Sequence, residues 1–368
     1  MKSNVFFCGW LIMFCIISCT QNERLITADI IDFDYFAQEF NKSAYSTDIS
    51  IMGVLDISIY ENIMVAFTMN PVALISIIDI DTEETLYVGG VHGRGPEEFL
   101  SLSTDCQFVN RNGHICIWIH DRNARKSTLI DITETVEKQT IVSCESLQFG
   151  RMYEQMNGML FLPTGEHFIK FPTIHKDARD DIHYYPKYVY FSDDTEVREL
   201  PFFKHGSFLL SASNNETVSE IMFNGVIHIK PDGTKAIDAF HYADHLNFLD
   251  LVKNQGFSMR NSKGMSVDEL ASASDTYLRQ NFVYVYNGVA VTDEYVLALY
   301  SGKPEEWSGE IVPYTKSAIR IFDWNGSPLY LVHIDKELRS ITYDRRTKRL
   351  YALDLDENIM YYELDDVI

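Results

Sequence analysis

Apolar residues along this chain come in short runs that turn residues interrupt. The runs are rich in Val, Ile, Tyr and Phe, which favour β-strands, and dipeptides such as Asp232-Gly233 and Asn325-Gly326 separate them. The helical period of 3.6 residues is nearly absent. One exception is Ser266-Val-Asp-Glu269, a capping-box pattern that predicts a short helix through Leu278. The pattern therefore predicts an almost entirely β-structured chain.

One unit of this pattern recurs along the chain. Each copy reads as a strand, a turn, a second strand, a polar turn and a third strand that closes on an apolar, an acidic and an apolar residue. The closing triplets are Ile78-Asp79-Ile80, Ile130-Asp131-Ile132, Leu249-Asp250-Leu251, Phe322-Asp323-Trp324 and Tyr362-Glu363-Leu364. A sixth, looser copy has Ser192 at the acidic position. The mean step of about 57 residues is longer than the roughly 40 to 45 of a minimal propeller blade, which leaves room for insertions.

Repeated antiparallel units without helices favour radial packing, because a closed ring leaves only short, protected sheet edges. The last unit, from Leu338 to Leu364, holds only three strands. The N-terminal run Ile26–Phe33 is predicted to lie beside it as the fourth strand and to close the ring. The sequence therefore predicts a six-bladed β-propeller over residues 26–368. Seven blades are the alternative, because the long intervals between copies have room for another.

The first 20 residues have the layout of a secretory signal. Lys2 precedes an apolar run from Val5 to Ile17, and Ser18 and Cys19 follow it. The run is shorter than the roughly 20 residues that a bilayer span needs. Ile16-Ile17-Ser18-Cys19 resembles the lipobox of bacterial lipoproteins, with an ordinary signal cut elsewhere as the alternative.

The lipobox resemblance implies a membrane anchor. Residues 1–18 would be removed, and several acyl chains on Cys19 would hold the protein at the membrane, since one chain alone binds only marginally. Residues 19–25 would form a short tether. The expected location is the cell envelope, as an outer-membrane lipoprotein that faces either the periplasm or the cell surface.

Charge and cysteine content narrow the choice of partners. The chain has 31 basic and 53 acidic residues, a net charge of −22, so nucleic acid and acidic lipid headgroups are poor partners for the folded part. Beyond the leader, the cysteines are Cys106, Cys116 and Cys144. Three is an odd number, which argues against a disulfide scaffold. Cys106 and Cys116 flank a predicted turn and could pair, but buried free thiols are the favoured interpretation.

Several motifs along the chain form a recognisable set. They are Cys19 in its lipobox, Gly93-Arg94-Gly95-Pro96 with Glu98-Phe99, Thr292-Asp293-Glu294-Tyr295 leading into Leu299-Tyr300-Ser301-Gly302, and the closing run Arg349 to Leu353. Together they resemble the TolB-like six-bladed β-propeller lipoproteins of gut Bacteroidota. The family usually has glycine where this chain has Glu97. The resemblance spans most of the mature chain and implies the fold and membrane anchoring, but no established reaction and no cofactor.

The glycine-rich stretch Val88–Leu100 matches neither a dinucleotide fingerprint nor a phosphate loop, because no Lys-Ser/Thr pair follows it and no helix-start pattern appears. The favoured interpretation is a corner between two blades, in which Pro96 restricts the backbone and Phe99 anchors the chain between blades. In a second interpretation His92 or Arg94 also faces the central pocket. These two side chains are therefore candidate ligand-binding residues.

Two further candidates come from an insertion in the fifth unit. Trp307 and Tyr314 stand in an acidic, turn-rich stretch, where a strand core does not explain a tryptophan. Both side chains could form an aromatic platform for a sugar ring or a peptide. The favoured alternative is that Trp307 packs the loop onto its own blade.

No motif predicts a metal site or a catalytic group. His241 and His245 would suit zinc if a helix carried them, but the repeat places the residues between them in a hairpin turn. No nucleophile elbow is present. The favoured function is a membrane-anchored propeller that binds a glycan, peptide or partner protein without catalysis. The alternatives are a hydrolase or lyase that acts on a polymer at the central pocket, and a structural subunit of an envelope complex.

Overall fold

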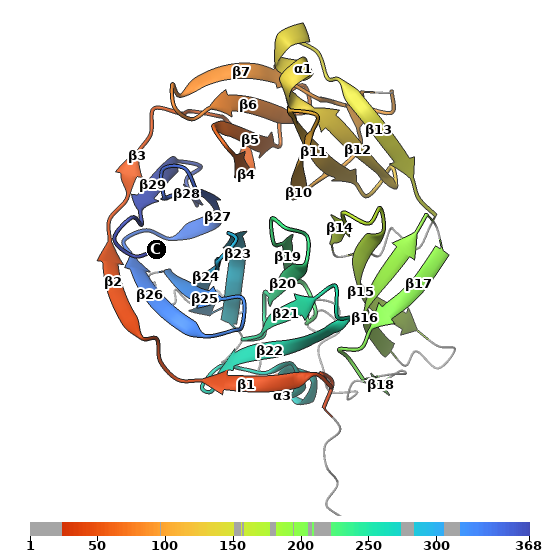
Figure 1. Ribbon diagram of the computed structural model, residues 1–368, viewed down its shortest axis with the longest axis vertical. Helices are drawn as coiled ribbons and strands as arrows, with labels where there is room; N and C mark the ends of the chain where they lie inside the picture. Colours follow the sequence, from red (N-terminus) through yellow and green to blue (C-terminus); the bar gives the residue numbers. More distant parts are fainter. Residues whose placement is uncertain are drawn as a thin grey trace, which may run out of the picture.

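The computed structural model is a ring of six sheets (Figure 1). A cavity lies at the centre of the ring. The residues that the structure describes are 24–95, 97–150, 156, 158–176, 182–193, 195–204, 208–209, 222–273, 283–304 and 317–368. The predicted leader with Cys19, and the candidates Trp307 and Tyr314, lie outside these residues. The six-bladed propeller is thus confirmed, and the seven-bladed alternative is wrong.

Blades 1 and 2 each contain four antiparallel strands, which run in order from the centre of the ring outward. They are β4 (Val54–Tyr60), β5 (Ile63–Thr68), β6 (Ile75–Asp79) and β7 (Glu84–Gly89) in blade 1, and β10 (Leu102–Arg111), β11 (His114–Asp121), β12 (Lys126–Asp131) and β13 (Ser143–Gln148) in blade 2. The connection between them contains a short parallel pair, β8 (Val91–His92) and β9 (Glu98–Phe99).

Blades 3 and 4 follow the same plan. Their strands are β14 (Met159–Phe161), β15 (His167–Lys176), β16 (Ile182–Ser192) and β17 (Thr195–Leu200) in blade 3, and β19 (Gly225–Ile229), β20 (Lys235–Phe240), β21 (Leu246–Asp250) and β22 (Gln255–Asn261) in blade 4. In blade 3 the short β18 (Phe208–Leu209) also pairs with β16.

Blades 5 and 6 complete the ring. Their strands are β23 (Val283–Val291), β24 (Tyr295–Pro304), β25 (Ala318–Asp323) and β26 (Pro328–Ile334) in blade 5, and β27 (Leu338–Asp344), β28 (Arg349–Asp354) and β29 (Ile359–Glu363) in blade 6. All six sequence copies correspond to blades, and the recurring acidic position ends the third strand of each. The acids satisfy nearby backbone donors as expected; Asp323 accepts from the N–H groups of Asn325 and Ser327.

Three N-terminal strands lie along the outside of three successive blades (Figure 1). β1 (Asp29–Phe33) pairs in parallel with β22, β2 (Gln38–Lys42) pairs in parallel with β26, and β3 (Tyr45–Ser46) pairs antiparallel with β29. An N-terminal strand therefore does complete the last blade, as predicted. The predicted segment was wrong, however: the run Ile26–Phe33 covers blade 4, and Tyr45–Ser46 closes blade 6. Alternating apolar residues define a strand but do not say which sheet edge it joins.

Among the residues that the structure describes, two short helices interrupt the β-structure. α3 (Val267–Ser272) starts at the predicted capping box, in which Ser266 and Glu269 bond each other's backbone N–H groups, but it ends before Leu278. α1 (Ile132–Lys138) was not predicted. Its N-cap is Asp131, whose side chain accepts from the Glu134 N–H. No described helix is long and apolar enough to cross a membrane.

The core is divided among the blade interfaces. Within the described residues, six clusters of buried apolar side chains each fill the space between two neighbouring blades. Phe99 is 1% exposed and belongs to the cluster between blades 1 and 2, so the predicted anchor at the glycine-rich corner is confirmed. Each blade buries its apolar residues against its neighbours, and the inner strands are left to line the centre of the ring.

Candidate functional site

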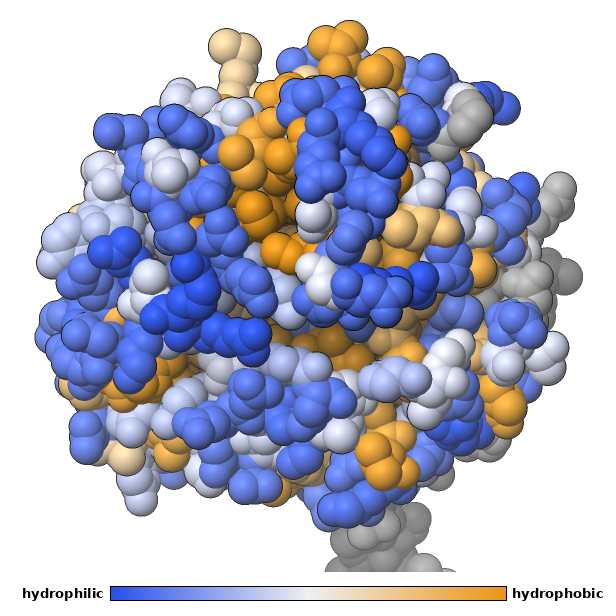
Figure 2. All heavy atoms as spheres, turned by 45° about the horizontal axis from the view of Figure 1, so that its top comes forward, coloured by the Kyte–Doolittle hydropathy of each residue, from blue (hydrophilic) through white to orange (hydrophobic). Residues whose placement is uncertain are grey.

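The inner strands of all six blades line a central cavity of about 870 Å³. It lies within the 300 to 1,000 Å³ that small-molecule sites typically occupy. In the space-filling view the molecule is hollowed at its centre, with apolar side chains inside the hollow and polar ones around it (Figure 2). The lining includes the turns that follow the inner strands, for example Glu61 after β4 and Arg345 after β27. The cavity therefore reaches the face of the ring that carries these turns.

Aromatic and charged side chains meet at this face of the cavity. Tyr60 and Phe108 stack with their ring centroids 5.5 Å apart, although they come from different blades. The Arg345 guanidinium lies 5.8 Å from the Tyr60 ring, and Arg111 pairs with Glu145 at 2.8 Å. All five residues line the cavity. The rim thus combines a flat apolar surface with hydrogen-bonding groups of both signs.

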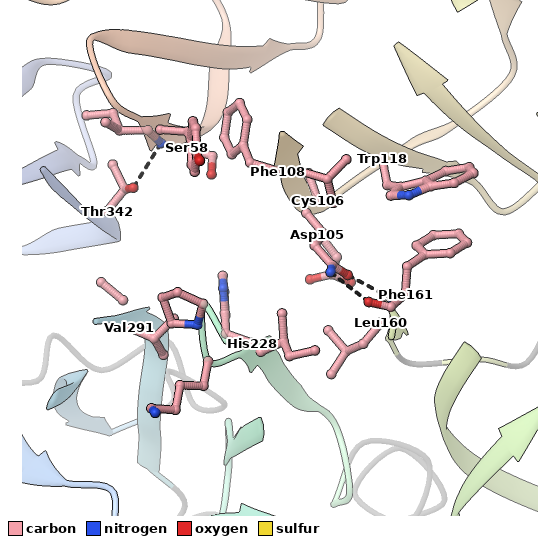
Figure 3. Close-up of a pocket in the computed structure, with 18 of the residues that line it drawn as sticks. Ser58, Asp105, Cys106, Phe108, Trp118, Leu160, Phe161, His228, Val291 and Thr342 are labelled. Carbon is pink, nitrogen blue, oxygen red and sulfur yellow. Dashed lines mark hydrogen bonds between the residues drawn. The ribbon is translucent and has the colours of Figure 1, made fainter. Parts of the chain in front are cut away.

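The wall deeper in the ring carries titratable groups from three blades. Burial is the main reason that the pKa of Asp56 is raised to about 6; the nearby Asp105 carboxylate adds to the rise, and a 2.8 Å bond from the Ile57 N–H opposes it. Burial also raises the pKa of Cys106 to about 12 and lowers that of His228. At neutral pH the cavity lining therefore presents a thiol and a neutral imidazole in addition to the two carboxyl groups. Figure 3 shows Asp105, Cys106 and His228 around the cavity.

The part of the wall next to Asp105 and Cys106 is aromatic. Trp118 stacks on Phe161 with ring centroids 3.8 Å apart (Figure 3). His167 meets the edge of Phe161 at 4.9 Å. Gln107 fixes this segment by accepting from the Phe161 N–H and donating to its carbonyl, both at 2.8 Å. A side chain from blade 2 thereby sets the position of the inner strand of blade 3.

The inner strands of four blades share an irregularity. The register between first and second strands shifts after Val54, Leu102, Tyr286 and Leu338, which are equivalent positions in blades 1, 2, 5 and 6. Such shifts locally bend a strand and re-aim its side chains. Beside these shifts, three side chains donate hydrogen bonds to a backbone carbonyl of the neighbouring blade. His241 Nδ1 donates to Tyr286 at 2.7 Å, Asn287 Nδ2 to Leu338 at 3.1 Å, and Arg339 Nη1 to Val54 at 3.1 Å.

The candidate ligand-binding residues of the sequence do not meet in one place. His92 and Arg94 are exposed on the connection between blades 1 and 2, and neither is among the residues that line the central cavity. Trp307 and Tyr314 fall outside the described residues. Ligand binding by these four side chains stays a prediction.

His241 and His245 flank the turn between β20 and β21, as expected. His245 is buried, and its Nδ1 lies 2.8 Å from the Ser258 hydroxyl.

The three cysteines that the structure describes are free thiols. Cys106 pairs with Ile119 across the first hairpin of blade 2, whereas Cys116 lies opposite Val109, so the two cysteines are not neighbours.

The sequence did not single out Asp56, Cys106 or His228 as cavity residues. Each comes from a strand that carries no motif, and only the ring closure brings them together.

Together the fold and the cavity define a six-bladed propeller with a ligand-sized central site. No family model and no curated protein matches the chain. Among solved structures, the chain is similar to a Bacteroides fragilis protein named as exported, with 13% identity and a TM-score of 0.50 over 91% of this chain and 98% of that one. This likeness supports the fold.

Two other solved structures are similar to the chain at lower TM-scores. The propeller domain of Cps50 (Swd1) from Myceliophteria thermophila is 14% identical, with a TM-score of 0.44 over 87% of this chain and 99% of that one. Regucalcin from Agrobacterium tumefaciens, described as a calcium-binding protein, is 11% identical, with a TM-score of 0.46 over 89% and 95%.

Proposed function

We propose that this chain is a non-catalytic binding propeller of the bacterial envelope that holds a glycan at the mouth of its central cavity. The observation that carries the proposal is the Tyr60–Phe108 stack on the rim of an 870 Å³ cavity, with Arg111, Glu145 and Arg345 around it. The face of an aromatic ring suits the C–H faces of a sugar, and the surrounding charged groups suit its hydroxyls. A peptide is the competing ligand.

A binding experiment separates these ligands. The thermal midpoint of the full chain is measured against a panel of oligosaccharides and peptides; a ligand at 100 times its Kd adds about 2.7 kcal/mol of stability. Phe108→Ala should weaken glycan binding about tenfold or more. The matched control is Tyr45→Ala, which removes half of another stacked pair, Tyr45 and Tyr361 at 5.3 Å, away from the cavity. Equal binding by both variants, or a response to peptides only, would contradict the glycan proposal.

Membrane anchoring is part of the same proposal. It is supported by the lipobox around Cys19 and by the similarity to a protein named as exported. A Cys19→Ala variant should lose its partition into the membrane fraction while the propeller still folds. Persistent membrane association of this variant would refute a lipid anchor at this position.

One observation favours hydrolysis of the bound ligand as a second function. Asp56 lines the cavity, and its pKa of about 6 suits a general acid near neutral pH, with Asp105 as a second carboxyl group close by. Product analysis with the ligand found above decides between the two. Loss of turnover but not of binding in Asp56→Asn would establish an enzyme, whereas an intact ligand after prolonged incubation supports the binding module.

A further inference from the structure

Blade 2 carries a second cluster of chemically active side chains, which the proposed function does not use. Cys116 on β11, Asp131 on β12 and Cys144 on β13 each offer one ligand atom, and these three atoms all lie within 4.8 Å of one another. Cys116 and Asp131 are direct partners across the two strands. Three adjacent strands therefore bring two thiols and a carboxylate to one point.

The position of Cys144 depends on a register shift. Leu129 pairs with Glu145 and Ile130 pairs with Ser143, so Cys144 is the extra residue between them. A residue at such a shift is re-aimed relative to the regular alternation of a strand. Here the shift leaves the Cys144 Sγ 4.0 Å from Asp131 Oδ2.

A comparison within the ring shows that the fold does not need these thiols. The same register shift occurs in blades 1, 3 and 5, where the extra residues are Leu86, Val197 and Leu329. The residues that pair with the equivalent acids are Ile63 for Asp79, Tyr295 for Asp323 and Arg349 for Glu363. Of these described positions, only those of blade 2 hold sulfur on both sides of the acid.

The carboxylate of Asp131 is held from both sides. Its Oδ1 accepts from the Glu134 N–H at 2.8 Å, and its Oδ2 lies 2.7 Å from His114 Nδ1. Asp131 is 5% and Cys116 1% exposed, whereas Cys144 is exposed to solvent. Two members of the cluster are thus buried, with the Asp131 carboxylate held by hydrogen bonds, and solvent reaches the cluster at Cys144.

A disulfide does not fit this arrangement. Cys116 and Cys144 lie on β11 and β13, the two strands that flank β12. Strands spaced by 4.7 to 4.9 Å place residues two strands apart at roughly 9 to 10 Å. Disulfides need Cα atoms no more than about 7 Å apart. The two thiols are therefore better placed to bind one metal ion between them than to form a disulfide bond.

We propose that Cys116 Sγ, Cys144 Sγ and Asp131 Oδ2 form a site for a thiophilic divalent cation, Zn²⁺ by ligand type, with water as the fourth ligand. Zn–S distances of about 2.3 Å and Zn–O distances of about 2.0 to 2.2 Å imply tetrahedral ligand atoms roughly 3.3 to 3.8 Å apart. The present spacing reaches this with side-chain movements of about 1 Å. His114 does not bind the ion; it orients the carboxylate, as outer hydrogen-bond partners of metal ligands do.

The test is titration of the reduced full chain with Zn²⁺ by calorimetry and with Cd²⁺ by ultraviolet thiolate-to-metal absorption. The main variant is Cys144→Ser, because an exposed position tolerates the change without loss of the fold. The matched control is Cys106→Ser, which removes another thiol of blade 2, on the cavity wall. Leader cysteines are the same in every variant, so differences between variants belong to the folded domain.

Cys144→Ser should lower the affinity at least 100-fold and remove part of the thiolate absorption, while Cys106→Ser should leave both unchanged. His114→Ala should weaken binding about 10- to 100-fold and retain the thiolate absorption, because both sulfur ligands remain. Unchanged titrations for Cys144→Ser would overturn the site. A Cys116–Cys144 disulfide found by mass spectrometry in the native protein would also overturn it.

Discussion

Blade 4 and blade 1 both place carboxyl groups between blades, but in opposite electrostatic surroundings. In blade 4, Asp238 lies 2.6 Å from Lys170 Nζ, and the Tyr188 hydroxyl donates to it at 2.5 Å. Asp244, in the same blade, pairs with Arg320 at 2.9 Å. In blade 1, no described Lys, Arg or His lies within ion-pair distance of Asp56, and its pKa rises to about 6. The comparison shows what a nearby cation changes. A carboxyl group that has one forms an ion pair that stabilises the interface between blades, whereas a carboxyl group without one keeps a raised pKa and can exchange a proton near neutral pH.

Removing the cation from the interface of blades 3 and 4 should have the largest effect. Lys170→Met leaves the fully buried Asp238 with only neutral partners, so we expect a loss of about 3–5 kcal/mol in the free energy of unfolding. Urea unfolding measures it. The matched control is Lys187→Met in the same blade, whose more exposed pair with Glu196 should contribute at most about 1 kcal/mol. Equal losses in the two variants would contradict the comparison.

Neutralising the unpaired carboxyl group should instead stabilise the protein. The pKa of Asp56 is higher in the folded protein, about 6, than its usual 3.8, so its protonation stabilises the fold below about pH 4, and this stabilisation is lost as the pH rises through 6. Asp56→Asn should therefore gain up to about 3 kcal/mol over wild type between pH 4 and pH 8. Urea midpoints across this range measure the gain.

A carboxyl group whose pKa is shifted in the opposite direction provides the control for Asp56→Asn. Lys42 holds the pKa of Asp366 below its usual value, so Asp366→Asn should lose stability at neutral pH and none in acid. A pH-independent difference between Asp56→Asn and wild type would show that the unpaired carboxyl group does not titrate in this range.

Removing an uncharged hydrogen bond between two blades should change the free energy of unfolding least. Asn287 donates to the Leu338 carbonyl at 3.1 Å without any charged partner. Asn287→Ala should lower the free energy of unfolding by about 1 kcal/mol at every pH. A marked pH dependence for this variant would mean that charges elsewhere, and not the pairing of each carboxyl group, govern the contrast between the blades.

The parts of the fold that follow a local pattern could be predicted. The recurring acid at Asp79, Asp131 and Asp323 marked the end of each third strand because a turn there needs an acceptor for its backbone donors. The capping box at Ser266 marked a helix start for the same kind of reason. α1 was missed because seven residues are too few to show a period, and its N-cap had already been assigned to the repeat.

The candidate sites depend on contacts between strands, which no local pattern encodes. Asp56, Asp105 and His228 come from three blades and converge only when the ring closes. The cluster around Asp131 depends on a shift of one residue at Cys144. The sequence shows that both cysteines exist, but only the pairing of β13 against β12 shows that they share one point.

The wrapping of residues 29–46 around three blades has a mechanical consequence. A pull on the N-terminal end first loads the backbone hydrogen bonds of residues 25–28 with Phe202 and Lys204, and then β1, which is bonded in parallel along β22 by five consecutive residue pairs. A force along that strand loads its hydrogen bonds together in shear, so blade 4 would bear the load before any of it reached β2 or the two-residue closure at β3. A tether attached ahead of this segment could thus be stretched without opening the ring.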